Sequence, residues 1–139
     1  MATLYQKYGF AVDQILSEDQ ALPNATTGDS TNTIQLNLTG SDNIHVVVCS
    51  ASVTTELASG ATLEIRPTVG LTADAVDVVL PSILITQAVQ SDASWASGEM
   101  ITQFVLPAAL LGSYRYLKLT YVTSANESDD KVEAFTIIT

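Results

Sequence analysis

The stretch Tyr114–Val122 constrains the fold more than any other part of the chain. It reads Tyr-Arg-Tyr-Leu-Lys-Leu-Thr-Tyr-Val, and apolar and polar residues alternate along it. Successive side chains of an extended chain point to opposite faces, so three apolar residues share one face: Leu117, Leu119 and Tyr121. Gly112 and Ser113, just before the stretch, favour a turn. The pattern predicts a β-strand with one face on a hydrophobic core, and such a strand needs partners elsewhere in the chain.

Several other stretches have the composition of short strands separated by turns. They are Thr33–Leu38, Ile44–Val53, Ala61–Thr68, Val78–Leu80, Ser82–Val89, Met100–Leu106 and Val132–Ile138. Ile44–Val53 is almost continuously apolar, which predicts that this strand is buried on both faces. Ser17–Gln20 leads into Pro23–Ser30, which is rich in turn residues, and both are predicted to lie outside the strands, as is Val69–Asp77.

These elements indicate the fold class. The chain has 139 residues, which is the size of one domain with a substantial core. About seven or eight short strands at regular spacing, without a long helix, are typical of an all-β, antiparallel β-sandwich. The length and the loop pattern favour a jelly roll of about eight strands over an immunoglobulin-like sandwich.

The N-terminal residues 1–16 differ from the rest. Their apolar residues recur at roughly helical spacing, at Leu4, Tyr8, Val12 and Ile15. Gly9 lies within this pattern and weakens a helix by about 1 kcal/mol relative to alanine. We predict an N-terminal arm or short helix at 1–16, which docks on a neighbouring subunit or packs on its own core, followed by the jelly-roll domain at 17–139.

The composition narrows the possible partners. Fifteen acidic residues against five Lys and Arg give a net charge of −10. Nucleic acids and anionic membranes are bound through basic patches, so neither is expected as a partner. A basic or mixed-charge protein partner fits the charge, and so does a surface that is acidic only for solubility. No stretch approaches 18 consecutive apolar residues, and no secretion signal is expected at the N-terminus.

The residues that catalysis needs are scarce. The chain has one histidine, His45, and one cysteine, Cys49, and both adjoin a run of valines typical of a core strand. There is neither a glycine-rich phosphate loop nor a Gly-x-Ser-x-Gly motif. The carboxylates of Glu127, Asp129 and Asp130 are of the kind that bind Ca²⁺, but their spacing matches no defined calcium loop. We therefore expect no enzyme activity and neither cofactor nor metal.

The candidate functional residues are aromatic and basic residues suited to an interface. Trp95 is the single tryptophan and lies in a loop of small and polar residues. We predict that it covers one end of the sandwich as a lid or that it serves as an interface anchor. The other candidates are Leu4, Tyr5, Tyr8, Tyr114, Arg115, Tyr116 and Lys118. For Tyr116 and Lys118, a place on the solvent face of a sheet is the alternative.

Three segments of the chain resemble the tailed-phage capsid cement (decoration) proteins of the Bbp16-like family. They are Leu16–Leu22 (Leu-Ser-Glu-Asp-Gln-Ala-Leu), Ser30–Leu36 (Ser-Thr-Asn-Thr-Ile-Gln-Leu) and Arg115–Tyr121 (Arg-Tyr-Leu-Lys-Leu-Thr-Tyr). The order of elements between them is also similar, so the resemblance spans most of residues 16–138. Residues 1–15 look like an addition to the family pattern.

The resemblance implies a jelly-roll protein on the outer surface of an HK97-type phage head, made in the host cytoplasm. Such a protein binds where major capsid subunits meet and stabilises the shell. Its implied partners are the major capsid protein and its own copies, as a dimer or trimer at symmetry axes. Two alternatives stay open from the residues: a carbohydrate-binding or adhesion module that stacks sugars on Trp95 and the tyrosines, and a head-fibre base or tail component of the virion.

Overall fold

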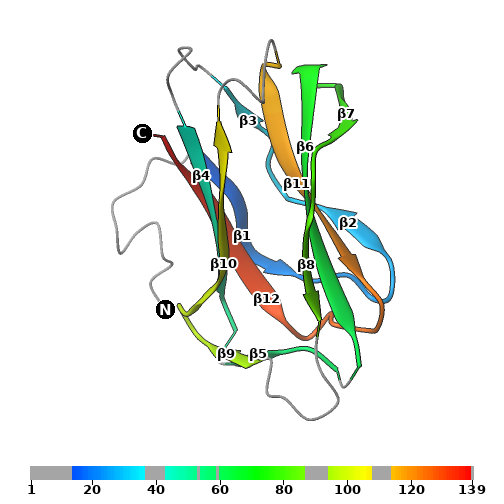
Figure 1. The fold of residues 1–139 in the computed structure, drawn as a ribbon. Coiled ribbons are helices and arrows are strands. Elements are labelled where there is room, and N and C mark those ends of the chain that lie inside the picture. The colour runs from blue at the N-terminus through cyan, green and yellow to red at the C-terminus, as the bar shows by residue number, and fades with distance from the viewer. Residues whose placement is uncertain are drawn as a thin grey trace.

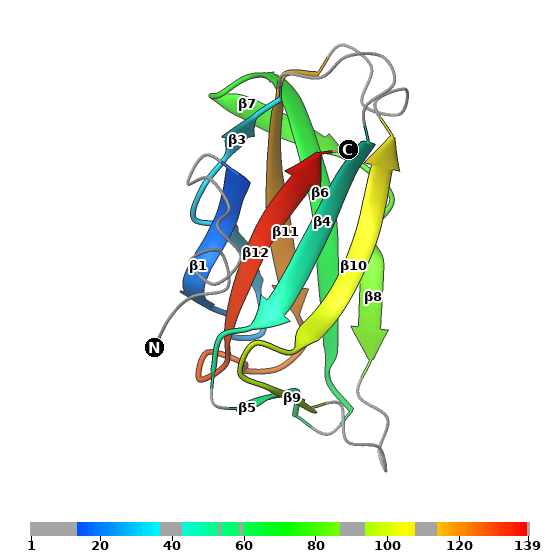
Figure 2. The same ribbon diagram turned by 90° about the vertical axis from the view of Figure 1, so that its left-hand side faces the viewer.

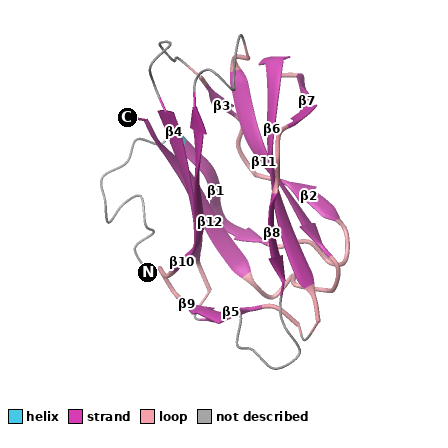
Figure 3. Ribbon diagram, in the orientation of Figure 1, coloured by secondary structure: helices cyan, strands magenta, loops and turns pink. Residues whose placement is uncertain are grey.

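A computed structural model describes residues 14–36, 43–52, 54–58, 60–86, 94–107 and 114–138. These residues form twelve β-strands that build two facing antiparallel sheets and a small two-stranded ribbon (Figures 1 and 3). The predicted all-β, antiparallel sandwich is confirmed.

The first sheet has four strands. Their order is β1 (Ile15–Ala21), β12 (Lys131–Ile138), β4 (Asn43–Ser50) and β10 (Met100–Pro107), and every neighbouring pair is antiparallel. Figure 2 shows this sheet face-on, with β1 and β10 as its two edges. The edge strand β1 follows β12 with two register shifts, whereas β10 follows β4 in regular register from Thr102 to Pro107.

The second sheet is centred on the long strand β6. Its order is β2 (Thr27–Asp29), β11 (Tyr116–Thr123), β6 (Thr62–Thr72) and β7 (Ala75–Val79). In addition, β3 (Ile34–Gln35) pairs with β11, and β8 (Ile83–Thr86) pairs with the first half of β6. At one end of the sandwich, β5 (Thr54–Glu56) pairs with β9 (Ser94–Ala96) (Figure 1).

The order of these strands is that of a jelly roll. To compare the order with a jelly roll, we count β2 with β3 as one interrupted strand and β7 with β8 as another, and we leave out the β5–β9 ribbon. Eight strands then remain, numbered along the chain. The first sheet has the order 1-8-3-6 and the second sheet has the order 2-7-4-5. This arrangement is the double Greek key, in which consecutive strands cross between the two sheets, except for the fourth and fifth, which pair within the second sheet as β6 with β7 and β8. It also brings the first strand of the chain beside the last.

The main core lies between the two sheets. The predicted inward face of β11 is confirmed, because Leu117, Leu119 and Tyr121 are all fully buried. The facing strand β4 contributes its own alternate residues to the same cluster: Ile44, Val46 and Val48. Two-fold alternation thus places one side of each strand in the core.

Strand β4 is buried on its other face as well, as its apolar run predicts. Val47 and Cys49 form a second cluster with Phe135 and the partly buried Ile137 of β12. Alternation puts these residues on the side of the four-stranded sheet that faces away from the main core. A central strand covered on both faces explains why the polar–apolar alternation is lost there.

Three of the predicted loops are wrong. Pro23–Ser30 contains the short strand β2, which pairs with β11. Ser17–Gln20 lies in β1, and its polar residues fit an edge strand that is partly exposed. The strand is interrupted at Asp19, whose φ is 45°. Most of residues 69–77 belong to the β6–β7 hairpin. Gly70 allows the two strands of this hairpin to approach closely. A Cβ at this position would collide with the Ala75 carbonyl oxygen and would lie 2.7 Å from the Val76 Cα, so only glycine fits here.

Candidate interface surfaces

The predicted interface residues fall in three separate places. Leu4, Tyr5 and Tyr8 lie outside the described residues. Trp95 lies in β9, which pairs with β5 at one end of the sandwich. Its side chain is partly buried and packs against the main core. Trp95 therefore takes part in covering that end of the core, in a short strand and not in the loop that its small polar neighbours predict.

The Tyr114–Lys118 group lies at the opposite end from Trp95, where β11 begins (Figure 1). Tyr114 packs against the main core, and Tyr116 is partly buried opposite Gly70 of β6 and Gln35 of β3. The Arg115 side chain is exposed, while its backbone bonds to Gly70 and Leu36. Among the described aromatic candidates, Trp95 therefore lies apart from Tyr114 and Tyr116.

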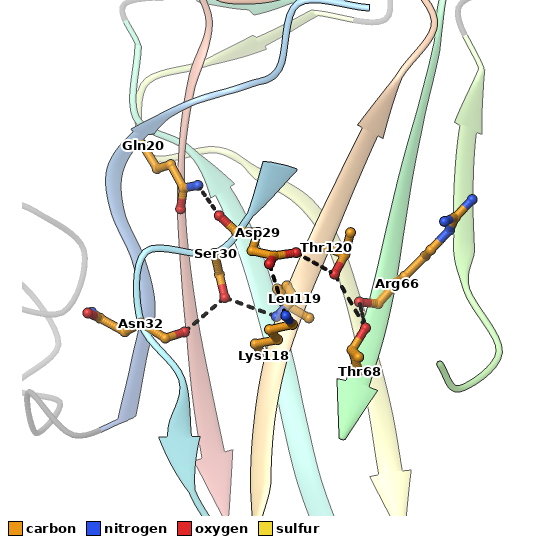
Figure 4. A network of polar contacts seen from close by, with 9 residues as sticks. All are labelled: Gln20, Asp29, Ser30, Asn32, Arg66, Thr68, Lys118, Leu119 and Thr120. Carbon is orange, nitrogen blue, oxygen red and sulfur yellow. Dashed lines mark hydrogen bonds and ion pairs between the residues drawn. The ribbon is translucent and has the colours of Figure 1, made fainter. Parts of the chain in front are cut away.

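Lys118 has an ionic partner in its own chain. Its Nζ lies 2.9 Å from Asp29 Oδ2, and the Lys118 side chain is only 22% exposed (Figure 4). Thr120 Oγ1 donates to the other carboxylate oxygen of Asp29 at 3.0 Å. The hydrogen bond from Lys118, joined by that from Thr120, lowers the pKa of Asp29. The positive charge of Lys118 is thus engaged between β11 and β2.

The same outward face continues across β6. The hydroxyl groups of Thr120 and Thr68 lie 3.4 Å apart, and both residues are buried although they face away from the core (Figure 4). Farther along β6, Arg66 forms a bidentate pair with Glu64, with Nε to Oε1 at 2.7 Å. This sheet face is a polar surface whose charges are mostly paired within the chain.

A crossing segment, residues 30–32, closes one side of the sandwich. Asn32 donates from its backbone to the Leu16 carbonyl at 2.9 Å and from Nδ2 to the Ile15 carbonyl at 3.2 Å. Ser30 Oγ accepts from the Leu119 backbone and donates to the Asn32 carbonyl (Figure 4). The segment therefore ties β1 of one sheet to β11 of the other.

Gln20 and Tyr121 reinforce this closure. The Gln20 amide donates to the Asp29 carbonyl at 2.7 Å and accepts from the Thr31 backbone at 2.8 Å. The Tyr121 hydroxyl lies 2.8 Å from Ser17 Oγ, in a bond between the two sheets at a fully buried position. Burial is the main reason why the pKa of Tyr121 is raised far above its ordinary value. We name the β1 edge, the crossing segment and these two residues the closed side.

Glu127 is a buried carboxyl group whose role the sequence did not reveal. It lies in the turn between β11 and β12, is 3% exposed, and its Oε1 accepts from the Ala58 backbone at 2.9 Å. Its backbone donates to the Pro23 carbonyl at 3.2 Å. Burial, followed by a carboxyl–carboxyl contact with Asp130, raises the pKa of Glu127. Glu127, a candidate calcium ligand with Asp129 and Asp130 by its sequence, thus connects its turn to two other loops, through its side chain to Ala58 and through its backbone to Pro23.

Within the described ranges, no group of three or more His, Cys, Asp or Glu residues is placed to hold a metal ion. In the same ranges, no helix has the length and the apolar character to cross a membrane. No protein-family model matches the chain, and no curated protein sequence matches it either.

Proposed function

We propose that this chain is a structural virion protein, a capsid cement (decoration) protein that binds the outside of an HK97-type phage head between major capsid subunits and stabilises it. The proposal rests on the likeness of three segments to the Bbp16-like family. It assigns no enzymatic activity and no cofactor. The implied partners are the major capsid protein and other copies of this chain.

The observation that carries the proposal is the position of the three family-like segments in the fold. They are up to about a hundred residues apart in sequence (Leu16 to Arg115), yet they meet at the closed side. Asn32 of the second segment bonds to Leu16 of the first, and Ser30 bonds to Leu119 of the third. Three family-like segments that form one mutually bonded unit are what a shared scaffold would leave. Chance matches would be scattered over the fold.

The surfaces are compatible with a shell-binding protein. The net charge of −10 favours association with basic rims of capsid subunits, through an attraction that salt screens. Many copies on one particle need only modest affinity at each site, because simultaneous contacts strengthen the assembly. Trp95 lies at the opposite end of the sandwich from Tyr114 and Tyr116, so these three residues do not form a continuous aromatic platform of the kind that a sugar-binding module uses.

A binding experiment with capsids tests the proposal. Expanded heads prepared without this protein should take up the purified chain to a fixed number of copies, and the decorated heads should resist heat and mechanical stress better than bare heads. Binding should weaken as ionic strength rises, and unexpanded procapsids serve as the control. Failure to bind, or bound heads that are no more stable than bare ones, contradicts the proposal. A glycan array covers the alternative: saturable sugar binding that Trp95→Ala abolishes would replace it.

A further inference from the structure

The outer face of the four-stranded sheet is the side that points away from the main core. One row of residues crosses it from edge to edge: Phe135 of β12 is paired with Ile15 of β1 and with Val47 of β4, and Val47 is paired in turn with Gln103 of β10. Directly paired residues of an antiparallel sheet share a face. None of the four belongs to the main core, so all four lie on the outer face.

The exposure of this face changes abruptly between β4 and β10. Along the row, Ile15 is 2%, Phe135 5% and Val47 8% exposed, whereas the member of the row in β10 is exposed. A second pair on the same face shows the same change, because Cys49 of β4 is 4% exposed and its partner Met100 of β10 is 50% exposed. The outer face is therefore covered over β1, β12 and β4, and the cover ends before β10.

No described strand supplies this cover. In Figure 2, which views the sheet from its outer side, the strands of the second sheet lie behind it, and no described strand crosses in front of it. Side chains that are almost fully buried need other atoms packed closely on them. The exposed fractions are those of a single chain, so the covering atoms belong to this chain and lie outside its described residues.

Residues 1–13 suit the cover in their point of attachment and in their length. The described chain begins at Gln14, whose carbonyl accepts a hydrogen bond from Thr136 Oγ1 at 3.3 Å, and the next residue is Ile15 of the covered row. An extended chain advances about 3.3 Å per residue and neighbouring strands lie about 4.8 Å apart, so a few residues reach from β1 to β4. The internal segments outside the described residues have at most seven residues each and connect one strand to the next.

The composition of residues 1–13 suits the cover as well. The segment has only two charged residues, Lys7 and Asp13, and five large apolar or aromatic residues after Met1: Leu4, Tyr5, Tyr8, Phe10 and Val12. Packing such side chains on an apolar sheet face removes both surfaces from water.

We propose that residues 1–13 dock on the outer face of the four-stranded sheet of their own chain and form a third layer over β1, β12 and β4. The layer stops short of β10, whose outward side chains stay in water. Of the two placements that the sequence leaves open for this segment, the burial of the outer face favours the one on its own domain. The inference goes beyond the proposed function and does not depend on it.

Nuclear Overhauser effects in the full, isotope-labelled chain test the proposal directly. The Val47 methyl groups and the Phe135 ring should show contacts to side chains of residues 1–13. The Val105 methyl groups are the matched control, because Val105 lies on the same face at 46% exposure and should show none. If Val47 and Phe135 contact no residue of 1–13, the proposal is overturned. Contacts between labelled and unlabelled chains in a mixed sample overturn it too, because the cover then comes from another copy.

Two matched double variants of the full chain give a second measurement. Leu4→Ser with Val12→Ser should lower the Tm by at least about 5 °C, because two apolar side chains of the cover lose their favourable burial. The control, Leu71→Ser with Val79→Ser, makes the same replacements at positions of the second sheet that are 60% and 56% exposed, and it should shift the Tm by less than about 2 °C. Equal shifts contradict the proposal. If these results hold and expanded heads still fail to bind the chain, the proposed function fails while this inference stands.

Discussion

The two edges of the four-stranded sheet show how one protein treats equivalent positions differently. At β1, the backbone carbonyls of Ile15 and Leu16 accept hydrogen bonds from Asn32, and the register against β12 is broken twice. At β10, the strand runs regularly against β4 from Thr102 onward and ends in an uncharged, partly apolar edge. The first edge contributes to the stability of the monomer. The second edge contributes through its pairing with β4 and through Leu106, which is buried in the main core.

The largest expected difference in the free energy of unfolding is between a substitution in the closed side and one in β10. Tyr121→Ala should lower the free energy of unfolding by about 3–5 kcal/mol, because it leaves a large cavity and removes the bond to Ser17. Val105→Ala should change it by less than about 0.5 kcal/mol, since the side chain is half exposed. Urea unfolding followed by fluorescence measures both, at a concentration where the chain is monomeric. Equal losses would show that the closed side does not contribute more to stability than β10.

Glu127 tests how the loops beside the closed side are fastened. Glu127→Ala should cost about 0.5–1.5 kcal/mol, because it removes a part-buried hydrogen bond to the Ala58 N–H. Glu127→Gln keeps an acceptor oxygen and removes the titration. The raised pKa of Glu127 means that its favourable contribution is fully present below the unfolded value, near 4.5, and is lost as the pH rises through the folded value.

Glu127→Gln should therefore gain stability relative to the parent as the pH rises above about 4.5. Melting curves from pH 4 to pH 8 measure this difference. The charged groups to consider are few: Asp130 meets Glu127, residues 22–25 carry no titratable side chain, and Ala58 presents only its backbone. A stability difference that is constant with pH would mean that Glu127 ionises without cost in the folded chain.

Asn32 tests the covering of the β1 edge directly. Asn32→Ala removes the side-chain bond to the Ile15 carbonyl and should lower the free energy of unfolding by about 0.5–1.5 kcal/mol. Thr33→Ala, at the adjacent exposed position, is the control and should have little effect. Chemical denaturation measures the loss, and the oligomeric state should not change. If Asn32→Ala promotes self-association, the crossing segment protects β1 from pairing with other chains as well.

Asp29 should show the smallest effect and the opposite pH dependence to Glu127. Its pair with Lys118 is partly exposed, so Asp29→Asn should cost at most about 1 kcal/mol. Its pKa is lowered, so the contribution is present above the unfolded value, near 3.8, and is lost as the pH falls through the folded value. Parent and Asp29→Asn should converge at low pH. Asp77→Asn, on the exposed edge strand β7, is the matched control.

The sequence predicted the parts of the fold in which alternation is uninterrupted. The inward face of β11 and the two-sided burial of β4 follow from residue type alone. The prediction failed at β1 and at the β6–β7 hairpin, where bulges, a positive φ and the close approach at Gly70 break the period. Such breaks depend on which strand lies alongside, and no single stretch of sequence contains that information.

The candidate interface was harder to predict than the fold. Trp95 and Tyr114 attract attention as aromatic residues, yet both pack against the core, and Lys118 is paired with Asp29, eighty-nine residues away in sequence. The buried role of Glu127 has no signal in its acidic turn, because its partner is a backbone group of a distant loop.

Burial of β4 on both faces has a consequence for thiol chemistry. Cys49, the single cysteine, lies within that strand, and burial followed by the nearby charge of Glu133 raises its pKa to about 11. At pH 7 about one thiol in ten thousand is then ionised, so alkylating reagents and oxidants meet an almost inert group. Cys49 becomes reactive only when the sheet opens. The rate at which Cys49 is labelled therefore measures how often the strand β4 opens, both for the protein free in solution and for the protein bound to a particle.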